Sequence, residues 1–514
     1  MLIDTATALR LAASRTPARA AVVEGEHRLS YRELVDAADA VAGALRSAGI
    51  AEGDRVVLAV ANSLQATVAL LAAQAAGGVA VPVNFRARAA TLGELLDAVD
   101  PAALLFDEHT AGAVAELGAA HVRGRLLVAV NGAGAARSLS DLAQAGAELD
   151  TPLPAIDPAR TALVLLTSGS TGRPKLIPLT HQQSLARVFG LCMNHGFGHD
   201  DDMRCLGIMP LYHTVGIHAV LLLALLTNGT YYPVGTFEPE AVLALIEREQ
   251  ISYVFGAPTM FARLLDVAAP GAMASVRDAM YAGAPMDPAL VRRVADEVTS
   301  NFTHIYGNTE TYNSLFYRRA GTCPGALRPG IMHRARIVAL GGDHHDELGP
   351  GIEGELIVDA CSPEAFDGYA QPAHTAERVR AGWYYTGDVA VADEQGRVYI
   401  RGRTDDMIIT GGENVYPADV ESAVLRHPAV AECAVVGVPD ATWGQLVVAL
   451  VVPAEASTSA AELEGFCREE PTLDGYKRPR RVVLVDKLPV NPSGKRPLPE
   501  LRALAQEALG RAHA

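Results

Sequence analysis

The segment LVLLTSGSTGRPKLIPLTH, residues 163–181, combines residue types that bind phosphate. A strand-like apolar run leads into a loop with two glycines, four hydroxyl residues and Lys175. Glycines let backbone N–H groups approach a phosphate closely, and the hydroxyls and the lysine add donors and positive charge. The segment is not a Walker A loop, because Gly-Lys-Ser/Thr is missing and Pro174 precedes the lysine. It therefore predicts a polyphosphate site of another type, although a flexible surface loop has a similar composition.

Four later segments carry further polar residues in a fixed order: YGNTE at 306–310, YYTGD at 384–388, RGRTDDMIITGGENVYPADVE at 401–421 and NPSGK at 491–495. Together with the first segment they resemble the motifs of the adenylate-forming superfamily, which includes acyl-CoA synthetases, luciferases and peptide-synthetase adenylation domains. The resemblance implies an acid-thiol ligase that uses ATP and Mg²⁺ to convert a carboxylic acid into an acyl-adenylate. The acyl group then passes to a thiol, for which coenzyme A is the expected donor.

Adenylation makes a carboxylate reactive by giving it AMP as a leaving group, and its main demand is neutralisation of phosphate charge. The resemblance implies that Thr309 contacts the α-phosphate, that Glu310 holds the magnesium ion, and that Lys495 bridges the carboxylate and the α-phosphate. It assigns the triphosphate to Thr167, Ser168, Gly169, Ser170, Thr171, Gly172 and Lys175. It assigns adenine and ribose to Gly283, Ala284, Pro285, Tyr306, Asp388 and Arg403.

Within the superfamily, the stretches MPLYHTVGIHAV at 209–220, YGNTETYNSLF at 306–316 and TWGQ at 442–445 resemble the 4-chlorobenzoate:CoA ligases. This likeness implies an acyl pocket lined by Gly190, His213, Thr214, Val215, Phe255, Ala282, Ile305, Gly307, Tyr312 and Asn313. It implies that CoA meets Gly411, Gly412, Trp443, Tyr476 and Arg478. His213 would act as a gate to the acyl pocket, and a hydrogen-bonded core histidine is the alternative interpretation.

Three pocket positions depart from those ligases. Gly190 stands where they have phenylalanine, Thr214 replaces valine, and Tyr312 replaces methionine. A pocket with two added hydroxyls is more polar, so a hydroxylated, aminated or longer aryl acid such as a cinnamate fits it better than chlorobenzoate. We expect two hydroxyl groups to be available to a substituent of the acid.

Two alternatives to a CoA ligase stay open at this point. The acyl group could pass to a carrier protein or an amine, or the enzyme could activate nitrite for diazotisation of an aryl amine. A catalytically silent binding protein on the same scaffold is disfavoured, because Glu310, Asp388 and Lys495 are all present.

The composition and net charge disfavour several classes of binding partner and of site. A formal net charge of −16 disfavours general binding to nucleic acid or to acidic membranes. The six cysteines are scattered without a CxxC pair, which disfavours a disulfide framework or a zinc site. The apolar runs are shorter than the roughly 20 residues of a membrane helix, and the start lacks a secretory pattern. We therefore expect a cytoplasmic enzyme of small molecules, either a monomer or a homodimer.

Strand-like and helix-like segments alternate through the first 306 residues, with strands expected at 54–60, 79–83, 162–166, 204–208, 253–257 and 278–282. This alternation predicts an α/β fold with two helix-covered sheets. Residues 131–158 are expected to form a surface connection, and residues 323–402 a small β-rich subdomain. A boundary at 404/405, with Asp405 as the hinge, separates residues 1–404 from a mobile α+β domain at 405–514.

Overall fold

The structure, a computed structural model, describes residues 3–130, 137–147, 153–168, 174–199, 201–440, 442–455, 457–473, 475–489 and 496–512. By compactness the chain divides into two units. Unit 1 comprises Met1–Ala335 and Val358–Tyr384, and unit 2 comprises Arg336–Ile357 and Tyr385–Ala514. The boundary at 404/405 and the hinge role of Asp405 stay predictions.

The first sheet of unit 1 has seven strands in the order β7-β6-β5-β3-β4-β8-β9. They are β3 (Arg55–Ala59), β4 (Val79–Pro82), β5 (Ala103–Phe106), β6 (Leu126–Ala129), β7 (Arg137–Ser138), β8 (Thr161–Ser168) and β9 (Pro174–Thr180). All neighbours pair in parallel except β8 and β9, which form an antiparallel hairpin. Parallel pairing follows from the predicted βαβ alternation.

The second sheet of unit 1 has the order β16-β15-β14-β13-β12-β10-β11-β1-β2. Its strands are β1 (Ala20–Glu24), β2 (His27–Ser30), β10 (Arg204–Gly207), β11 (Thr230–Pro233), β12 (Tyr253–Gly256), β13 (Asp278–Tyr281), β14 (Phe302–Asn308), β15 (Tyr312–Tyr317) and β16 (Arg328–Pro329). Its central strands are parallel, and both edges end in antiparallel pairs. The α/β class with two helix-covered sheets is confirmed.

Alternation along the strands decides which helices cover which face. In β3, Val56 and Leu58 join a core shared with the second sheet, while Val57 and Ala59 face the opposite side. The shared core also receives α1 (Thr5–Arg15), α2 (Tyr31–Ser47), α3 (Leu64–Ala75), α8 (His181–His195), the π-helix η1 (Val215–Leu221) and α9 (Leu222–Leu226). The outer face of the first sheet is covered by α4 (Ala89–Val99) and α5 (Glu108–Ala115), which the short α6 (Ala119–Val122) follows.

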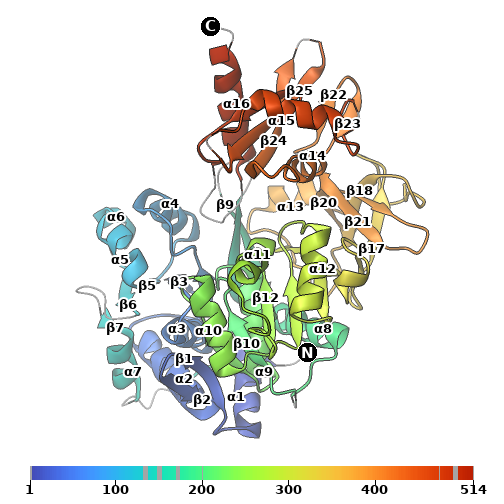
Figure 1. Ribbon diagram of the computed structural model, residues 1–514. Coiled ribbons are helices and arrows are strands. Elements are labelled where there is room, and N and C mark those ends of the chain that lie inside the picture. Colours follow the sequence, from blue (N-terminus) through green and yellow to red (C-terminus); the bar gives the residue numbers. More distant parts are fainter. Residues whose placement is uncertain are drawn as a thin grey trace. The chain divides into compact units, whose positions relative to one another are not determined.

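The outer face of the second sheet carries α10 (Pro239–Glu249), α11 (Pro258–Val267) and α12 (Pro288–Glu297), which Figure 1 shows in green and yellow-green in front of β10 and β12. Short segments η2 (Ala320–Thr322) and α13 (Pro372–Arg378) complete the helices of unit 1. Side-chain caps start the two longest capped helices. At α2, Ser30 and Glu33 form a capping box, and Thr180 and Gln183 form another at α8.

The expectation of a surface connection at 131–158 is wrong for residues 137–147, which form β7 and α7 (Leu139–Ala147). Leu139 and Leu142 are buried in the shared core. Gly146 lets α7 approach α2 closely, since a Cβ at this position would lie 1.8 Å from the Ala40 carbonyl oxygen. The amphipathic pattern of α7 is weak in the sequence, because one of its three buried residues is a glycine. Residues 131–136 and 148–152 lie outside the described ranges.

A smaller sheet occupies the predicted β-rich region. It contains β17 (Ala335–Val338), β18 (Gly354–Asp359), β19 (Val379–Arg380), β20 (Trp383–Ala392) and β21 (Val398–Arg403), and the chain passes between the units within β18 and β20.

Unit 2 also holds a five-stranded sheet with helices on both faces. Its strands are β22 (Ile408–Thr410), β23 (Glu413–Val415), β24 (Val430–Asp440), β25 (Gly444–Pro453) and β26 (Arg481–Leu484). One face packs against α14 (Pro417–Val424) and α15 (Ala460–Glu469), and the other against α16 (Leu498–Ala512).

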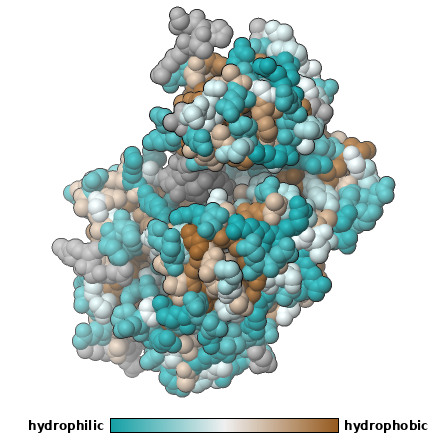
Figure 2. All heavy atoms as spheres, viewed as in Figure 1, coloured by the Kyte–Doolittle hydropathy of each residue, from teal (hydrophilic) through white to brown (hydrophobic). Residues whose placement is uncertain are grey.

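Hydrophilic residues predominate on the face of the molecule in Figure 2, in keeping with the net charge of −16. Among the described helices, none has the combination of length and hydropathy that crossing a bilayer needs.

Candidate active site

The residues predicted to hold adenine and the α-phosphate follow two adjacent parallel strands. Gly283, Ala284 and Pro285 come directly after β13, and Tyr306 lies in its neighbour β14, with Thr309 and Glu310 just beyond. Parallel strands end at the same edge of a sheet, which is where ligands bind in α/β folds. Gly283 has φ +89°, a conformation that a residue with a side chain adopts only with strain. The structure thus brings these predicted positions together.

The predicted phosphate loop is carried by the β8–β9 hairpin. Thr167 on β8 pairs directly with Lys175 on β9. Gly169, Ser170, Thr171, Gly172 and the side chain of Ser168 lie outside what the structure describes, as does Lys495. The hairpin therefore places the first and last residues of the motif beside each other.

Tyr369 links the hairpin to Glu310. The ammonium of Lys175 lies 5.2 Å from the centre of the Tyr369 ring, and the Tyr369 hydroxyl donates to Glu310 Oε1. Glu310 is only 7% exposed. Burial and the neighbouring Glu310 raise the pKa of Tyr369, so its hydroxyl stays a donor at neutral pH. The Tyr369 hydroxyl thereby fixes the orientation of the Glu310 carboxylate, while Lys175 lies against the Tyr369 ring.

Arg187 on α8 is fully buried and ties three distant segments together. Its Nε donates to the Glu364 carbonyl at 2.8 Å, one guanidinium nitrogen donates to Thr214 Oγ1 at 3.0 Å, and the other donates to the Thr309 carbonyl at 2.9 Å. Burial lowers the pKa of Arg187 to about 10, which leaves it protonated at neutral pH. The Tyr312 ring centre lies 5.2 Å from its guanidinium carbon.

The positions predicted to line the acyl pocket come from several elements, and two of them, Thr214 and Tyr312, contact this arginine. Gly190 lies on α8, Phe255 on β12, Ala282 after β13, Ile305 and Gly307 on β14, and Tyr312 and Asn313 on β15; His213 and Thr214 precede η1, which Val215 begins. His213 packs against Tyr212, with ring centres 4.5 Å apart. Single π-helical turns are frequent at functional sites.

One expectation about the pocket needs correction. The Thr214 hydroxyl is not simply available to a substrate, because it accepts from Arg187 and shares a 3.0 Å hydrogen bond with His218 Nδ1. The Tyr312 hydroxyl, in contrast, has no partner within the described part of the chain. Thr214 therefore completes a buried network. Of the two predicted hydroxyls, only that of Tyr312 is left for a substituent of the acid.

In unit 2, Asp388 and Arg403 pair as neighbours on β20 and β21. Arg403 donates to Asp388 Oδ1 at 3.0 Å, and its other nitrogen lies 3.8 Å from Asp405 Oδ2. The residues predicted for the ribose and for the hinge are therefore adjacent.

The residues predicted to meet CoA also lie in unit 2. Gly411 and Gly412 form the turn between β22 and β23, with φ of +60° and +89°. Gly411 N donates to the Trp443 carbonyl at 2.8 Å, and a Cβ at Gly411 would lie 3.1 Å from the indole ring. The guanidinium of Arg480, which the sequence did not single out, stacks 4.1 Å from the centre of the Trp443 ring. Tyr476 packs beside the core of unit 2.

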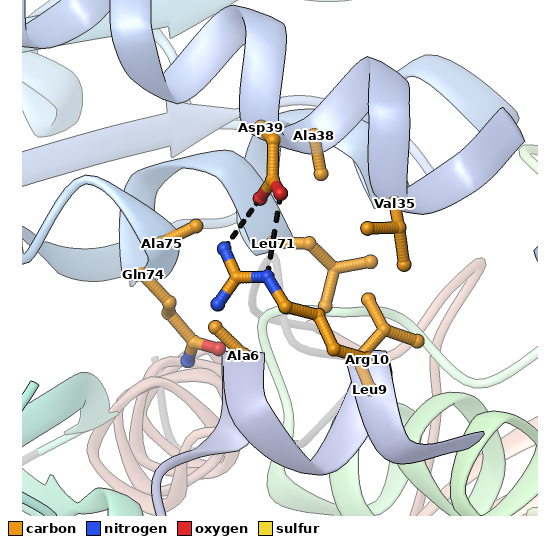
Figure 3. A pocket seen from close by; sticks show the side chains of 9 residues that line it. All are labelled: Ala6, Leu9, Arg10, Val35, Ala38, Asp39, Leu71, Gln74 and Ala75. Carbon is orange, nitrogen blue, oxygen red and sulfur yellow. Dashed lines mark hydrogen bonds and ion pairs between the residues drawn. The ribbon is translucent and has the colours of Figure 1, made fainter. Parts of the chain in front are cut away.

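Two hollows lie elsewhere in unit 1. One of about 410 Å³ is bordered by Glu52, Arg55 and Arg160. The other, of about 10 Å³, lies among α1, α2 and α3 beside the Arg10–Asp39 ion pair, where the two side chains point toward each other (Figure 3). That volume holds about one water molecule, so it is a packing gap.

Sequence reasoning missed Arg187, Glu364 and Tyr369. Arg187 had a signal, because it is a charged residue on the apolar face of an amphipathic helix, a placement that requires buried partners. Glu364 and Tyr369 lie in a segment without periodicity, and only the fold brings them to Glu310.

The comparisons with known proteins agree with this arrangement. Residues 9–370 match the model of the AMP-binding enzyme family, and residues 419–495 match its C-terminal domain. The chain is 35% identical to a 4-chlorobenzoate–CoA ligase of Arthrobacter sp. over 94% of its length and 92% of the ligase. It is 36% identical to a feruloyl-CoA synthase of Amycolatopsis sp. over 94% and 95% of the two chains.

Among solved structures, the ATP-bound form of MatB from Rhodopseudomonas palustris matches with a TM-score of 0.86 and 29% identity, covering 98% of this chain and 99% of that one. Because family models match residues 9–370 and 419–495, the chain belongs to the AMP-binding enzymes of the adenylate-forming superfamily.

Proposed function

We propose that the protein activates an aryl or aryl-acrylic acid with ATP, forming an acyl-adenylate and pyrophosphate, and then transfers the acyl group to coenzyme A with release of AMP. The observation that carries the proposal is the buried link from Lys175 through Tyr369 to Glu310, which adjoins the Arg187 network at the predicted acyl positions. The acid class and the CoA acceptor are supported by relatives that are named for 4-chlorobenzoate and for feruloyl-CoA.

Magnesium fits the residues present. Glu310 is a buried carboxylate with one oxygen fixed by Tyr369, and a carboxylate accepts several partners. Mg²⁺ is typically bound by one or two carboxylates together with substrate phosphates. When bound, the ion supplies positive charge to the phosphate oxygens. Its proposed ligand is Glu310, and Thr309 is proposed to contact the α-phosphate.

Each remaining residue has a proposed role in the first step. Thr167, Lys175 and the intervening loop bind the triphosphate, Tyr306 with Gly283–Pro285 binds adenine, and Asp388 with Arg403 binds the ribose. Lys495 is proposed to neutralise the charge that develops between the acid carboxylate and the α-phosphate.

The second step needs a path for the thiol. We propose that residues 405–514 form a mobile domain, with Asp405 as the hinge. Gly411 and Gly412 let pantetheine approach the backbone closely, and Trp443 with Tyr476 and Arg478 receives the CoA nucleotide. We propose a cytoplasmic location as well, because ATP and CoA are abundant there and all six cysteines are free thiols.

The test is pyrophosphate release with ATP and Mg²⁺ across benzoates, cinnamates and aliphatic acids, each with and without CoA. We expect acid-dependent release that CoA stimulates, with an acyl-CoA product in the mass spectrum. Release without a thioester would move the acceptor to a carrier protein or an amine. Release with aliphatic acids alone would contradict the proposed acid class.

Lys495→Ala provides the internal control for this scheme. Adenylation should fall severely, while thioester formation from a supplied acyl-adenylate should be largely retained. Equal loss in both half-reactions would contradict the assignment of Lys495 to the first step.

A further inference from the structure

Glu364 is a carboxylate buried directly beside Gly190. The side chain is 1% exposed, and Oε2 lies 3.2 Å from Nε2 of the equally buried His333. Its other oxygen, Oε1, has no hydrogen-bond partner in the described residues. A Cβ at position 190 would lie 1.9 Å from this oxygen. Glycine at 190 therefore leaves space that Oε1 occupies, at a position predicted to line the acyl pocket.

Two more polar groups without partners lie on β15, among the other positions predicted to line the pocket. The Tyr312 hydroxyl and Asn313 Nδ2 are buried and unpaired within the ranges that the structure describes. Tyr312 has φ +59°, a strained conformation for a tyrosine that its surroundings must enforce. Arg187 joins the two positions, because its Nε donates to the Glu364 carbonyl at 2.8 Å and its guanidinium carbon lies 5.2 Å from the centre of the Tyr312 ring. Glu364 and Tyr312 therefore belong to one polar cluster.

Unpaired buried polar groups are rare in folded proteins, because each loses its hydration without gaining a hydrogen bond. A cluster of them at a predicted ligand position indicates that the ligand supplies the missing partners. Glu364 Oε1 is an acceptor, so the matching group on the ligand is a donor.

We propose that Glu364 Oε1 accepts a hydrogen bond from a hydroxyl or amino substituent on the ring of the acid, with the Tyr312 hydroxyl as a second polar contact. This inference rests on the proposed adenylation of an aryl acid. His333 is a positioning residue, because it holds Oε2 and leaves Oε1 to the substituent. An acid without a donor leaves Oε1 unpaired, so a site of this kind selects strongly against it.

A purely structural role for Glu364 is the rival explanation. Its charge is one of those that stabilise the buried Arg187 cation. Loss of that role lowers activity with every acid to the same degree, whereas loss of a substrate contact lowers it only with acids that carry the donor. The ratio of kcat/KM between paired acids separates the two roles.

The experiment measures kcat/KM for pyrophosphate release with benzoate against 3-hydroxybenzoate, 4-hydroxybenzoate and 4-aminobenzoate, and with cinnamate against 4-hydroxycinnamate. Wild type is compared with Glu364→Gln, with Gly190→Ala, whose methyl group displaces Oε1, and with Glu377→Gln as a matched control on the exposed surface of α13. Thermal unfolding of each variant checks the fold.

We expect wild type and Glu377→Gln to prefer at least one donor-bearing acid by about 10-fold or more, the effect of a hydrogen bond to a charged group. Glu364→Gln and Gly190→Ala should each reduce that preference by about 10-fold. An unchanged preference in both variants, or no preference in wild type, would overturn the inference. Activity confined to aliphatic acids would overturn it while leaving adenylation intact, and a complete absence of acid-dependent release would overturn the proposed function as well.

Discussion

The predicted sites in the two units are built in opposite ways. In unit 1, the fully buried Arg187 donates hydrogen bonds to residues 27, 122, 123 and 177 positions away in the sequence, and of these residues only Thr309 is partly exposed. In unit 2, the predicted CoA residues lie on the short β22–β23 hairpin and on Trp443, which is 37% exposed.

The difference matches the chemistry proposed for each unit. Adenylation requires charged groups that are fixed before the reaction, in an environment with little water. Coenzyme A must bind and dissociate in each turnover, so an accessible aromatic ring and flexible cations suit its binding better than a buried network does. We therefore expect substitutions in the buried network to damage folding and adenylation together, and those on the hairpin to affect CoA alone.

The largest effect is expected for Glu310→Gln. The amide keeps the shape of the carboxylate and an acceptor for Tyr369 but loses the negative charge for the metal. We expect kcat for adenylation to fall by about 10²-fold or more, as for other charge-stabilising groups in active sites. Pyrophosphate release measured over a range of magnesium concentrations checks this. Wild-type activity at every concentration would remove Glu310 from the proposed metal site.

Arg187→Met should have the next largest effect. It leaves the buried Glu364 carboxylate without a nearby cation and the Thr309 carbonyl without its donor. Each buried acceptor left without its donor costs about 1–3 kcal/mol of unfolding free energy. Chemical denaturation is the measurement, with Arg187→Lys as the charge-retaining control. If both variants lost the same small amount of unfolding free energy, the Arg187 network would not contribute to the stability of unit 1.

Acid should destabilise unit 1 through its buried histidines. Burial lowers the pKa of His181 to about 4, and its Nδ1 accepts from the Thr5 backbone N–H. Because the folded pKa lies below the unfolded value near 6.5, the stabilisation is complete above pH 6.5 and is lost as pH falls toward 4. At saturation His181 alone accounts for about 3 kcal/mol.

The two tryptophans allow this pH effect to be assigned to a unit. Trp383 lies in unit 1 and Trp443 in unit 2, so Trp443→Phe leaves Trp383 as the single reporter. Denaturation followed by Trp383 fluorescence should show stability falling between pH 6.5 and 4, and falling less when His181→Asn is added. The same pH dependence with and without His181→Asn would contradict the assignment.

Trp443→Ala should have the smallest and most selective effect. The indole stacks with Arg480 and contacts Gly411, but it is partly exposed. Loss of one stacking contact raises the KM for CoA by about 5-fold to 30-fold, a cation–π or stacking effect of about 1–2 kcal/mol. Adenylation measured without CoA is the internal control. An equal decline in both half-reactions would mean that Trp443 stabilises unit 2 rather than binding CoA.

Much of the molecule could be predicted because its signals are local. The alternation of strands and helices, the Ser30–Glu33 capping box, and the strands at 204–208, 253–257 and 278–282 follow from residue patterns within a few turns. The failure at 137–147 has a local cause too, since the short α7 buries only Leu139, Leu142 and Gly146, which is too few apolar residues to show a helical period.

By itself, the sequence determined the family and the order of its motifs, because each motif is a short run of residues whose types suit phosphate, ribose or metal. The tertiary structure decided which of those groups are already paired. It placed Tyr369 between Lys175 and Glu310, and it joined Thr214 to Arg187. It also set Glu364 in the space left by Gly190. The physical reason is that the pairing of a polar group depends on contacts between segments 27 to 194 residues apart, and no pattern along the chain encodes these contacts.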